Sequence, residues 1–373
     1  MRKVAVFFGG KSCEREISIL TGAFVLNVLA GAEFDLLPVY VHTDGGFYTS
    51  RKAFDLDCFR KGNYSSFERI FFDGGAAYKF CGEKKIKRLG KVDGALNCCH
   101  GGLGEGGGVS AVMELNEIPL ASPRLTASGV FMDKSLTKIV AKGLGVPTVE
   151  FVRVKENDYK KRGAFLLKTI AAKLKYPVIV KPATLGSSIG IGVARDEEEA
   201  KAAIETAFKL DDCLIVEKFV EGKKDVNCAA YSVNGEIFVS EPETAFGEKL
   251  YGFSEKYLAD RGGLLEGERR KGGGRVEITG ELRDKIRAYT KTIYRRMNLV
   301  GVVRMDYLVA GEEVYLGEVN TVPGSLAYYL FCERLVDARS FFSDLIKDAL
   351  ARGGGEKEIV STGILSTVKL KRK

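Results

Sequence analysis

A polar segment near residue 310 carries the side chains whose types and spacing could do chemistry. The segment Val302–Val322 reads VVRMDYLVAGEEVYLGEVNTV, in which two strand-like runs flank a polar turn. Residues two apart in a strand point to the same face, so Arg304 and Asp306 share a face of the first run. Glu318 and Asn320 share a face of the second run for the same reason. A hairpin would place these two faces side by side.

Two carboxylates and a carboxamide would then converge beside a guanidinium. Magnesium prefers such hard oxygen ligands, and it usually takes one or two carboxylates and leaves its other positions to phosphates and water. The pattern predicts that Asp306, Glu318 and Asn320 bind Mg²⁺. On these residues alone, a solvated hairpin face with an incidental ion pair is an equally good interpretation.

Length and composition indicate a globular, reduced protein of two or three domains. The chain has 373 residues and 45% hydrophobic content, and no apolar run approaches the roughly 20 residues that cross a bilayer. The apolar run at the N-terminus is too short for a signal peptide and ends at Gly9-Gly10. The eight cysteines are scattered, and Cys98-Cys99 is not a C-x-x-C pair. We therefore expect a cytoplasmic protein without membrane contact.

The net charge of +8 is a modest excess that suits an anionic nucleotide substrate. Nucleic-acid binding is disfavoured because the basic residues are dispersed and no aromatic residues interleave with them. The chain has only two histidines, His42 and His100, and no Cys-His spacing, which argues against zinc.

The first third of the chain alternates strands, glycine turns and helices. This order is typical of a parallel sheet that binds ligands at the carboxyl ends of its strands. Gly45–Lys91 reads as irregular. The expected strands and helices are Val4–Phe8, Ile17–Leu29, Leu36–Val41, Gly94–Cys98 and Val109–Leu115.

The pattern changes after Pro123. A helix is expected from about Asp133 to Leu144, because Gly145-Val146-Pro147 is a typical helix stop. The segments Val149–Val220 and Asp225–Val322 read as rich in strands. The terminal helix covers Phe341–Arg352, and the tail Glu356–Lys373 is either an edge strand or a disordered basic arm.

A glycine- and serine-rich loop follows the apolar strand that ends at Lys181. Backbone N–H groups around Gly186-Ser187-Ser188 could form an anion nest, and Lys181 could neutralise phosphate charge. The P-loop pattern is absent, and no helix follows as in a dinucleotide fingerprint. A purely structural glycine hairpin remains the alternative.

A second apolar strand, Cys213–Val216, runs into the polar segment Glu217-Lys218-Phe219-Val220. Its backbone could pair with the edge of an adenine base while the Glu217 carboxylate accepts from the amino group. The alternative is a surface pair of opposite charges at Glu217-Lys218.

These segments together resemble the D-alanine–D-alanine ligase family of the ATP-grasp superfamily. The resemblance rests on five motifs in the same order along almost the whole chain. In chain order they are Gly9–Ser18 (GGKSCEREIS), His100–Gly106 (HGGLGEG), Met132-Asp133-Lys134, Lys181-Pro182 with Gly186-Ser187-Ser188, and Arg304-x-Asp306 with Glu318–Gly324 (EVNTVPG).

The resemblance implies an α/β fold, a three-domain ATP-grasp ligase. Residues 1–122 would form an N-terminal α/β substrate domain with a parallel sheet. Residues 123–220 and 221–352 would form central and C-terminal α+β domains that grip ATP. Residues 243–275 would form a glycine-rich lid, and 353–373 the basic tail.

The activity implied by the resemblance is the ATP- and Mg²⁺-dependent joining of two D-alanines for peptidoglycan precursor synthesis, with Mn²⁺ as a substitute ion. ATP would phosphorylate the first carboxylate, and the amine of the second D-alanine would displace phosphate. The family also suggests a homodimer. Two alternatives remain: an ATP-grasp ligase with another acceptor, such as D-serine or D-lactate, and a non-catalytic nucleotide-binding protein.

The resemblance also implies roles for single residues. Glu14 would hold the ammonium of the first D-alanine with His100 nearby, and Tyr257 of the lid would bond to Ser187 and Glu14. Arg304 and the Gly324 N–H would stabilise the oxyanion. The residues implied for ATP are Lys134, Lys181, Ser188, Glu217, Lys218, Val220, Asp225 and Lys256, and those for the acceptor are Tyr329 and Leu330.

The chain departs from the family pattern in three places. Gly106 and Ser110 stand where the HG…GE loop usually has an acid and a glutamine. Tyr329 replaces a smaller serine that contacts substrate, which puts the second amino acid in doubt. Asp225 matches the ribose-binding acid only if one residue is inserted before it.

Overall fold

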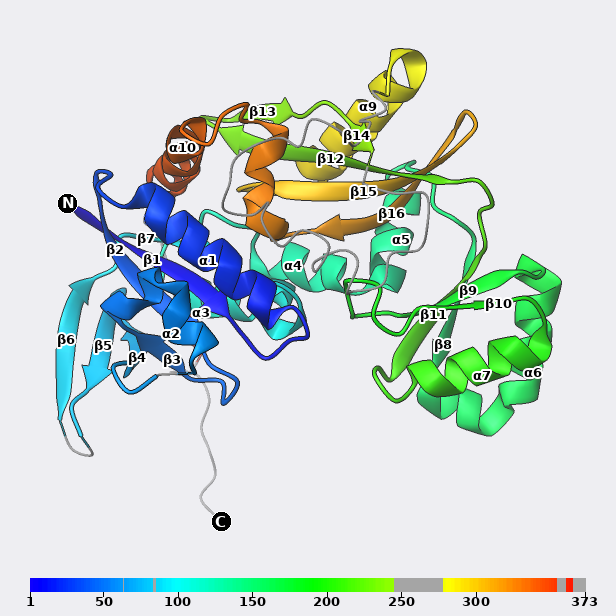
Figure 1. Ribbon diagram of the computed structural model, residues 1–373, viewed down its shortest axis with the longest axis horizontal. Coiled ribbons are helices and arrows are strands. Elements are labelled where there is room, and N and C mark those ends of the chain that lie inside the picture. The colour runs from blue at the N-terminus through cyan, green and yellow to red at the C-terminus, as the bar shows by residue number, and fades with distance from the viewer. Residues whose placement is uncertain (63, 83–84, 245–277, 354–359, 365–373) are drawn as a thin grey trace.

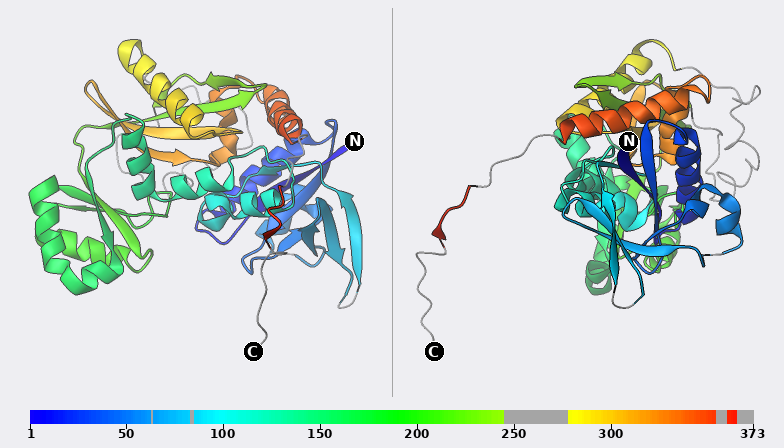
Figure 2. Two further views of the ribbon diagram at one scale, coloured as in Figure 1. Left: turned by 180° about the vertical axis from the view of Figure 1, so that it is seen from behind. Right: turned by 90° about the vertical axis from the view of Figure 1, so that its left-hand side faces the viewer.

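The computed structural model describes residues 1–62, 64–82, 85–244, 278–353 and 360–364. Three sheets lie in a row, with the C-terminal sheet between the N-terminal and central ones in Figure 1 and in the reverse view of Figure 2. Residues 245–275 of the predicted lid 243–275 and most of the basic tail fall outside the described residues. Within the described residues, no helix is long and apolar enough to cross a membrane.

The N-terminal sheet is mixed, with strand order β6-β5-β4-β3-β2-β1-β7. Strand β1 (Arg2–Gly9) pairs in parallel with β2 (Phe34–Val41) and β7 (Gly94–Asn97), which confirms the parallel strands predicted from the sequence. Within the described part of this sheet, the expected parallel pairing is limited to these three strands, and the prediction that residues 45–91 are irregular was wrong. That stretch forms antiparallel strands: β3 (Phe47–Thr49), β4 (Glu68–Asp73), β5 (Ala76–Phe80) and β6 (Ile86–Lys91).

Alternation along β1 builds a core on each face of this sheet. Val4, Val6 and Phe8 pack with helix α1 (Arg15–Leu29), while Ala5 and Phe7 face the other core. The second core includes α3 (Val109–Leu115), which follows the short helical segment η2 (Gly104–Gly108). Two short elements, η1 (Arg51–Phe54) and α2 (Leu56–Arg60), lie beside α1.

The central sheet has the order β10-β9-β11-β8 and one helical layer. Helices α6 (Glu156–Leu174) and α7 (Glu197–Ala207) share a single apolar core with its strands. Figure 1 shows both helices on one side of this sheet. Both helices were missing from the prediction, which read this segment as rich in strands. The strands are β8 (Phe151–Lys155), β9 (Val178–Pro182), β10 (Gly192–Ala194) and β11 (Cys213–Lys218).

The C-terminal sheet is antiparallel, with β14 pairing β12 beside the path β13-β12-β15-β16. Helix α9 (Gly280–Arg296) packs on it, and α10 (Asp337–Arg352) contacts both this sheet and α1. The strands are β12 (Lys224–Val233), β13 (Glu236–Val239), β14 (Glu243–Thr244), β15 (Val303–Ala310) and β16 (Glu313–Asn320). The turn segment η3 (Gly324–Leu330) follows β16 and lies against α1.

Helices α4 (Leu125–Met132) and α5 (Lys134–Gly143) pack against the C-terminal sheet. Ala127, Phe131 and Ala141 share a core with β15 and β16. The domain bounds implied by the family resemblance place both helices in the central domain, residues 123–220. Their packing places the start of α5 beside the β15–β16 hairpin, where the candidate site lies.

Candidate active site

The β15–β16 hairpin confirms the predicted pairing of polar residues. Arg304 lies opposite Asn320, and Asp306 lies opposite Glu318. The register shifts directly after Asp306, which marks a β-bulge at the edge of the polar face. Strand alternation and cross-strand register therefore bring together the side chains of Arg304, Asp306 and Asn320.

Arg304 holds Asp306 through a two-point contact. Its Nε and Nη2 donate to the two Asp306 carboxylate oxygens at 2.7 and 2.8 Å, and its Nη1 donates to the Tyr329 hydroxyl at 3.2 Å. The Asn320 Nδ2 donates to Asp306 at 3.0 Å. Burial opposes the charge on Arg304, but the Asp306 carboxylate and Tyr329 outweigh it and raise the already high pKa of Arg304 further, so the guanidinium remains charged.

The residues of this face fit a hard divalent cation. Asp306 and Glu318 offer carboxylate oxygens from neighbouring strands, and Asn320 offers a carboxamide oxygen two residues beyond Glu318. Their side chains are 20% and 33% exposed for the two acids, so an ion here would still reach solvent or substrate. The described residues hold no cluster of three His, Cys, Asp or Glu side chains, so such an ion would need oxygens from phosphates and water as well.

Lys134 links the hairpin to the glycine loop. It opens α5 directly after the N-cap Asp133, whose carboxylate accepts from the Ser135 N–H at 2.7 Å. The Lys134 Nζ lies 3.8 Å from a Glu318 oxygen and donates to the backbone carbonyl of Leu185. A cation therefore stands between the candidate metal ligands and the candidate phosphate loop.

The glycine loop after β9 has two consecutive serines in the left-handed region, where it was predicted to bind phosphate. Ser187 and Ser188 have left-handed φ values of 54° and 59°, which few side chains tolerate. The Ser187 hydroxyl donates to a Glu14 carboxylate oxygen, which joins this loop to the N-terminal glycine turn. A Cβ at Gly186 or at Gly101 would lie within 3 Å of the Glu14 carboxylate, so both positions need glycine for this approach.

A buried triad of charges lies at the base of the loop. Lys181 and Lys138 lie 2.7 and 2.9 Å from the two Glu217 carboxylate oxygens. Burial opposes the Glu217 charge, but the two ammonium groups outweigh it and lower its pKa to about 2. The sequence analysis did not single out Lys138. Its position four residues after Lys134 places both lysines on one face of α5, and that spacing was the available signal.

Of the remaining residues predicted to bind ATP, the structure describes Lys218, Val220 and Asp225. Lys218 ends β11 with an exposed side chain, and Val220 follows it, partly buried. Asp225 lies in β12 and pairs with Lys223 at 2.6 Å. Lys256 and Tyr257 lie outside the described residues.

His100 lies at the junction of the N-terminal and C-terminal sheets. It is 4% exposed, and both ring nitrogens have protein partners, the Val322 carbonyl at 2.7 Å and the Thr21 hydroxyl at 2.8 Å. Burial lowers its pKa to about 4. Glu105, from the same loop, accepts from the backbone N–H groups of Gly101 and Val322, and burial raises its pKa to about 7. Sequence analysis gave Glu105 no role.

The segment after β16 is a strained turn. Ser325, Leu326 and Ala327 have consecutive left-handed φ values of 48°, 52° and 48°. Each such residue costs roughly 1–2 kcal/mol for an L-amino acid. Gly324 immediately precedes them, and Tyr329 and Leu330 follow within the same segment.

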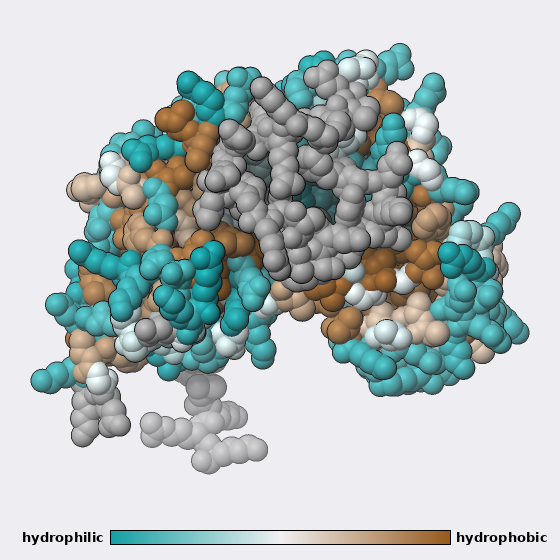
Figure 3. Space-filling model, viewed as in Figure 1, coloured by the Kyte–Doolittle hydropathy of each residue, from teal (hydrophilic) through white to brown (hydrophobic). Residues whose placement is uncertain are grey.

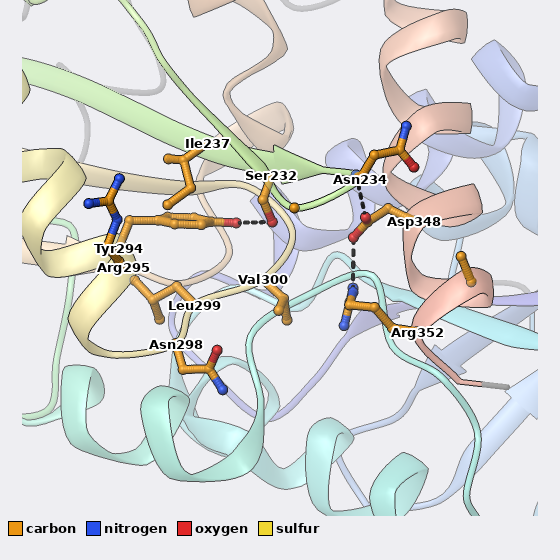
Figure 4. Close-up of a pocket in the computed structure, with 12 residues that line it drawn as sticks. Ser232, Asn234, Ile237, Tyr294, Arg295, Asn298, Leu299, Val300, Asp348 and Arg352 are labelled. Carbon is orange, nitrogen blue, oxygen red and sulfur yellow. Dashed lines mark hydrogen bonds and ion pairs between the residues drawn. The ribbon is translucent and has the colours of Figure 1, made fainter. Parts of the chain in front are cut away.

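A separate pocket of about 430 Å³ lies between α9, α10 and the β12–β13 turn. Figure 4 shows that its polar groups bond to one another: Tyr294 to Ser232, and Asp348 to Arg352 and the Asn234 backbone. None of the predicted site residues lines it. On the face in Figure 3, hydrophobic residues gather along the edge of the central unit that faces the rest of the molecule, while its outer surface is hydrophilic.

Comparisons with known proteins agree with this geometry. Residues 3–123 match the family described as D-ala D-ala ligase N-terminus, and residues 140–351 match D-ala D-ala ligase C-terminus. A D-alanine--D-alanine ligase of Nitratiruptor sp. is 34% identical over 349 residues, which cover 92% of each chain. One from Sulfurimonas denitrificans is 32% identical over 334 residues, with 88% of this chain and 89% of the relative covered.

Solved structures give the same fold. The D-alanine-D-alanine ligase of Helicobacter pylori superposes with a TM-score of 0.75 at 25% identity, covering 93% of this chain and 98% of that one. The VanG D-Ala:D-Ser ligase of Enterococcus faecalis, at 24% identity and a TM-score of 0.72, shows the fold alone. It covers 94% of this chain and 99% of its own. The two family descriptions match both halves of the chain, and relatives above 30% identity match most of its length. The chain therefore belongs to the D-alanine–D-alanine ligase family.

Proposed function

We propose that this protein uses ATP to join two D-alanines into D-alanyl-D-alanine, a peptidoglycan precursor. The observation that supports this most is an unbroken line of contacts across three parts of the fold. Glu14 bonds to Ser187 of the glycine loop, Leu185 of that loop bonds to Lys134, and Lys134 approaches Glu318 of the hairpin. The residues that we propose for an amino acid, for phosphates and for a divalent ion therefore adjoin one another.

In the first half-reaction, a carboxylate oxygen of the first D-alanine attacks the γ-phosphorus of ATP and ADP leaves. Glu14 holds the ammonium of this D-alanine by charge. Lys134, Lys181 and the backbone around Ser188 bind the phosphates. When bound to Asp306, Glu318 and Asn320, a divalent ion neutralises phosphate charge. The protein supplies positioning and electrostatics, so no protein nucleophile is required.

In the second half-reaction, the amine of the second D-alanine attacks the acyl-phosphate carbonyl carbon. The carbon–oxygen bond to phosphate then breaks. Arg304, fixed by Asp306, and the Gly324 N–H stabilise the oxyanion that develops on the carbonyl oxygen. Because Arg304 remains charged, it can do this throughout the working pH range.

The rest of the nucleotide site follows from β11 and β12. The backbone of Lys218 and Val220 and the carboxylate of Glu217 would meet the adenine edge, and Asp225 the ribose. Lys256 and Tyr257 would close over the phosphates and the amino acids. The ion we propose is Mg²⁺, with Mn²⁺ as a substitute. We also propose that the protein is cytoplasmic and forms a homodimer.

Tyr329 is the residue we expect to select the acceptor. Its hydroxyl lies 3.2 Å from the Arg304 Nη1, so it can present a hydrogen bond to the acceptor carboxylate beside the reacting centre. A hydrogen bond to a charged group contributes about 1.5–3 kcal/mol. Tyr329→Phe should therefore raise the KM for the acceptor D-alanine about 10-fold or more and leave the KM for ATP unchanged.

Initial-rate measurements at varied D-alanine and at varied ATP give both constants. Tyr329→Ser is the matched variant, because it restores a hydroxyl on a shorter side chain. An unchanged acceptor KM in Tyr329→Phe would remove this assignment. The alternative acceptors are tested by measuring turnover with D-alanine as the sole amino acid, with D-alanine plus D-serine, and with D-alanine plus D-lactate. We expect that D-alanine as the sole amino acid is sufficient for turnover.

A further inference from the structure

Side chains of the N-terminal sheet unit hold the backbone that follows β16 at three points. The Val322 carbonyl lies 2.7 Å from the His100 Nδ1, and the Val322 N–H donates to Glu105 at 3.2 Å. The Ser325 N–H donates to the Thr21 hydroxyl at 3.2 Å. Thr21 comes from α1, His100 from the loop after β7 and Glu105 from η2, so three parts of the N-terminal unit contact one short segment. Figure 1 shows α1 alongside the orange segment that follows β16.

The hydrogens of this network follow from elementary chemistry. A backbone carbonyl only accepts, so the His100 Nδ1 carries the hydrogen that points at Val322. Burial keeps the ring neutral, so its Nε2 accepts from the Thr21 hydroxyl. The Thr21 oxygen is then left to accept from Ser325. Each donor has an acceptor, which a buried polar network needs in order to be rigid.

The segment held in this way brackets Gly324 and includes the strained turn. Val322 precedes Gly324 by two residues, and the left-handed run begins at Ser325, where the Thr21 contact lies. Strained backbone persists only when surrounding contacts fix it, and it concentrates at functional sites. The contacts of Thr21, His100 and Glu105 supply that fixation from a different part of the fold.

We propose that Thr21, His100 and Glu105 form an interdomain clamp on Val322–Ser325, which positions the Gly324 N–H for the second half-reaction. This inference rests on the proposed function. The three are positioning residues, because they act through backbone groups and both His100 nitrogens are already engaged. Ser12 connects the clamp to Glu14, which we propose holds the first D-alanine. The Ser12 hydroxyl donates to the His100 carbonyl at 2.6 Å and accepts from the Glu14 N–H at 3.2 Å.

Thr21→Val tests the clamp with little change in shape. Loss of the hydroxyl leaves Ser325 and the His100 Nε2 without their partner, so the turn should shift relative to Glu14. Misplacement of this kind costs about 10- to 100-fold in kcat, and we expect the KM for ATP to stay within about twofold. Hydrogen exchange should accelerate in the peptide that covers residues 321–330. Thr21→Ser, which keeps the hydroxyl, should restore both readouts.

Thr290→Val is the matched control. Thr290 is fully buried in α9, and its hydroxyl bonds to the Tyr307 hydroxyl at 2.8 Å, so this variant loses a comparable contact outside the clamp. It should lose stability without losing kcat. Glu105→Gln is the second clamp variant should Thr21→Val fail to fold, because it places an amide where two N–H groups now donate.

Two results would overturn the clamp. One is wild-type kcat and wild-type exchange at 321–330 in folded Thr21→Val or Glu105→Gln. The other is an equal loss of kcat in Thr290→Val, which would make the effect one of stability alone. A wild-type protein that is inactive with every substrate would instead refute the proposed function, and the exchange measurement would still decide whether the clamp exists.

Discussion

Replacing Glu318 by alanine is expected to lower kcat on the order of 10³-fold, because the ion it would share with Asp306 stabilises several kcal/mol of developing charge. The fold should survive. The Glu318 side chain is one-third exposed, and its contact with Lys134 is a long 3.8 Å. Initial rates of phosphate release at saturating ATP and D-alanine measure the change in kcat. The melting temperatures of the wild type and of Glu318→Ala measure the change in stability.

Glu313→Gln provides the matched control for this experiment. Glu313 opens the same strand but lies exposed at the turn, where it bonds to the Tyr315 hydroxyl. Its removal should leave kcat unchanged. The dependence of rate on Mg²⁺ adds a second readout, since Glu318→Gln should need a higher Mg²⁺ concentration for half-activation. Wild-type activity in Glu318→Ala would remove the metal assignment.

Glu217→Gln is expected to destabilise the protein by about 3–5 kcal/mol at neutral pH, because it leaves the ammonium of Lys138 buried without its counter-charge. Both partners are almost fully buried, with side chains 3% and 0% exposed. Chemical denaturation of the wild type and the variant measures the difference. Adding Lys138→Met to the variant should recover much of the loss, because it removes the uncompensated charge.

The triad of Glu217, Lys181 and Lys138 also predicts a pH dependence. The Glu217 pKa is about 2 in the folded protein, against an ordinary value of 4.5. A carboxyl whose folded pKa is depressed stabilises the fold above its unfolded pKa, and this contribution disappears as pH falls through the folded value. The stability difference between wild type and Glu217→Gln should therefore hold above pH 4.5 and shrink toward pH 2. A difference that is constant over this range would contradict the pairing.

The hairpin of the candidate site could be predicted because its information is local. Alternation at Arg304-x-Asp306 and Glu318-x-Asn320 fixes the faces, and a short turn fixes the pairing. The parallel strands β1, β2 and β7 were equally clear, since each is a largely buried apolar run with a glycine within the next four residues. The glycine loop after β9 was found from the same kind of signal, and its phosphate-binding role stays a prediction. The fold class came from the resemblance of five ordered motifs to a known family.

Other elements escaped because their signals are weak or distant. Strand β3 has only three residues, and β4–β6 are separated by glycines, so no alternating pattern stands out. Helix α6 contains a kink at Arg162 beside Gly163, which interrupts its helical periodicity. Lys138 shares a face of α5 with Lys134, but its partner Glu217 lies 79 positions away, so the spacing alone does not predict the ion pair. Thr21 likewise depends on a contact with His100, 79 positions away.

The measurement that tests the central claim most directly follows the oxygen atoms of D-alanine labelled with ¹⁸O in its carboxylate. With ATP and Mg²⁺, the acyl-phosphate route predicts a D-alanyl-D-alanine that retains three labelled oxygens and a released phosphate that carries one. The label reaches phosphate because the bond between the carbonyl carbon and the former carboxylate oxygen breaks. Mass spectrometry reads both products. Unlabelled phosphate, or phosphate released without dipeptide, would contradict ligation through the carboxylate.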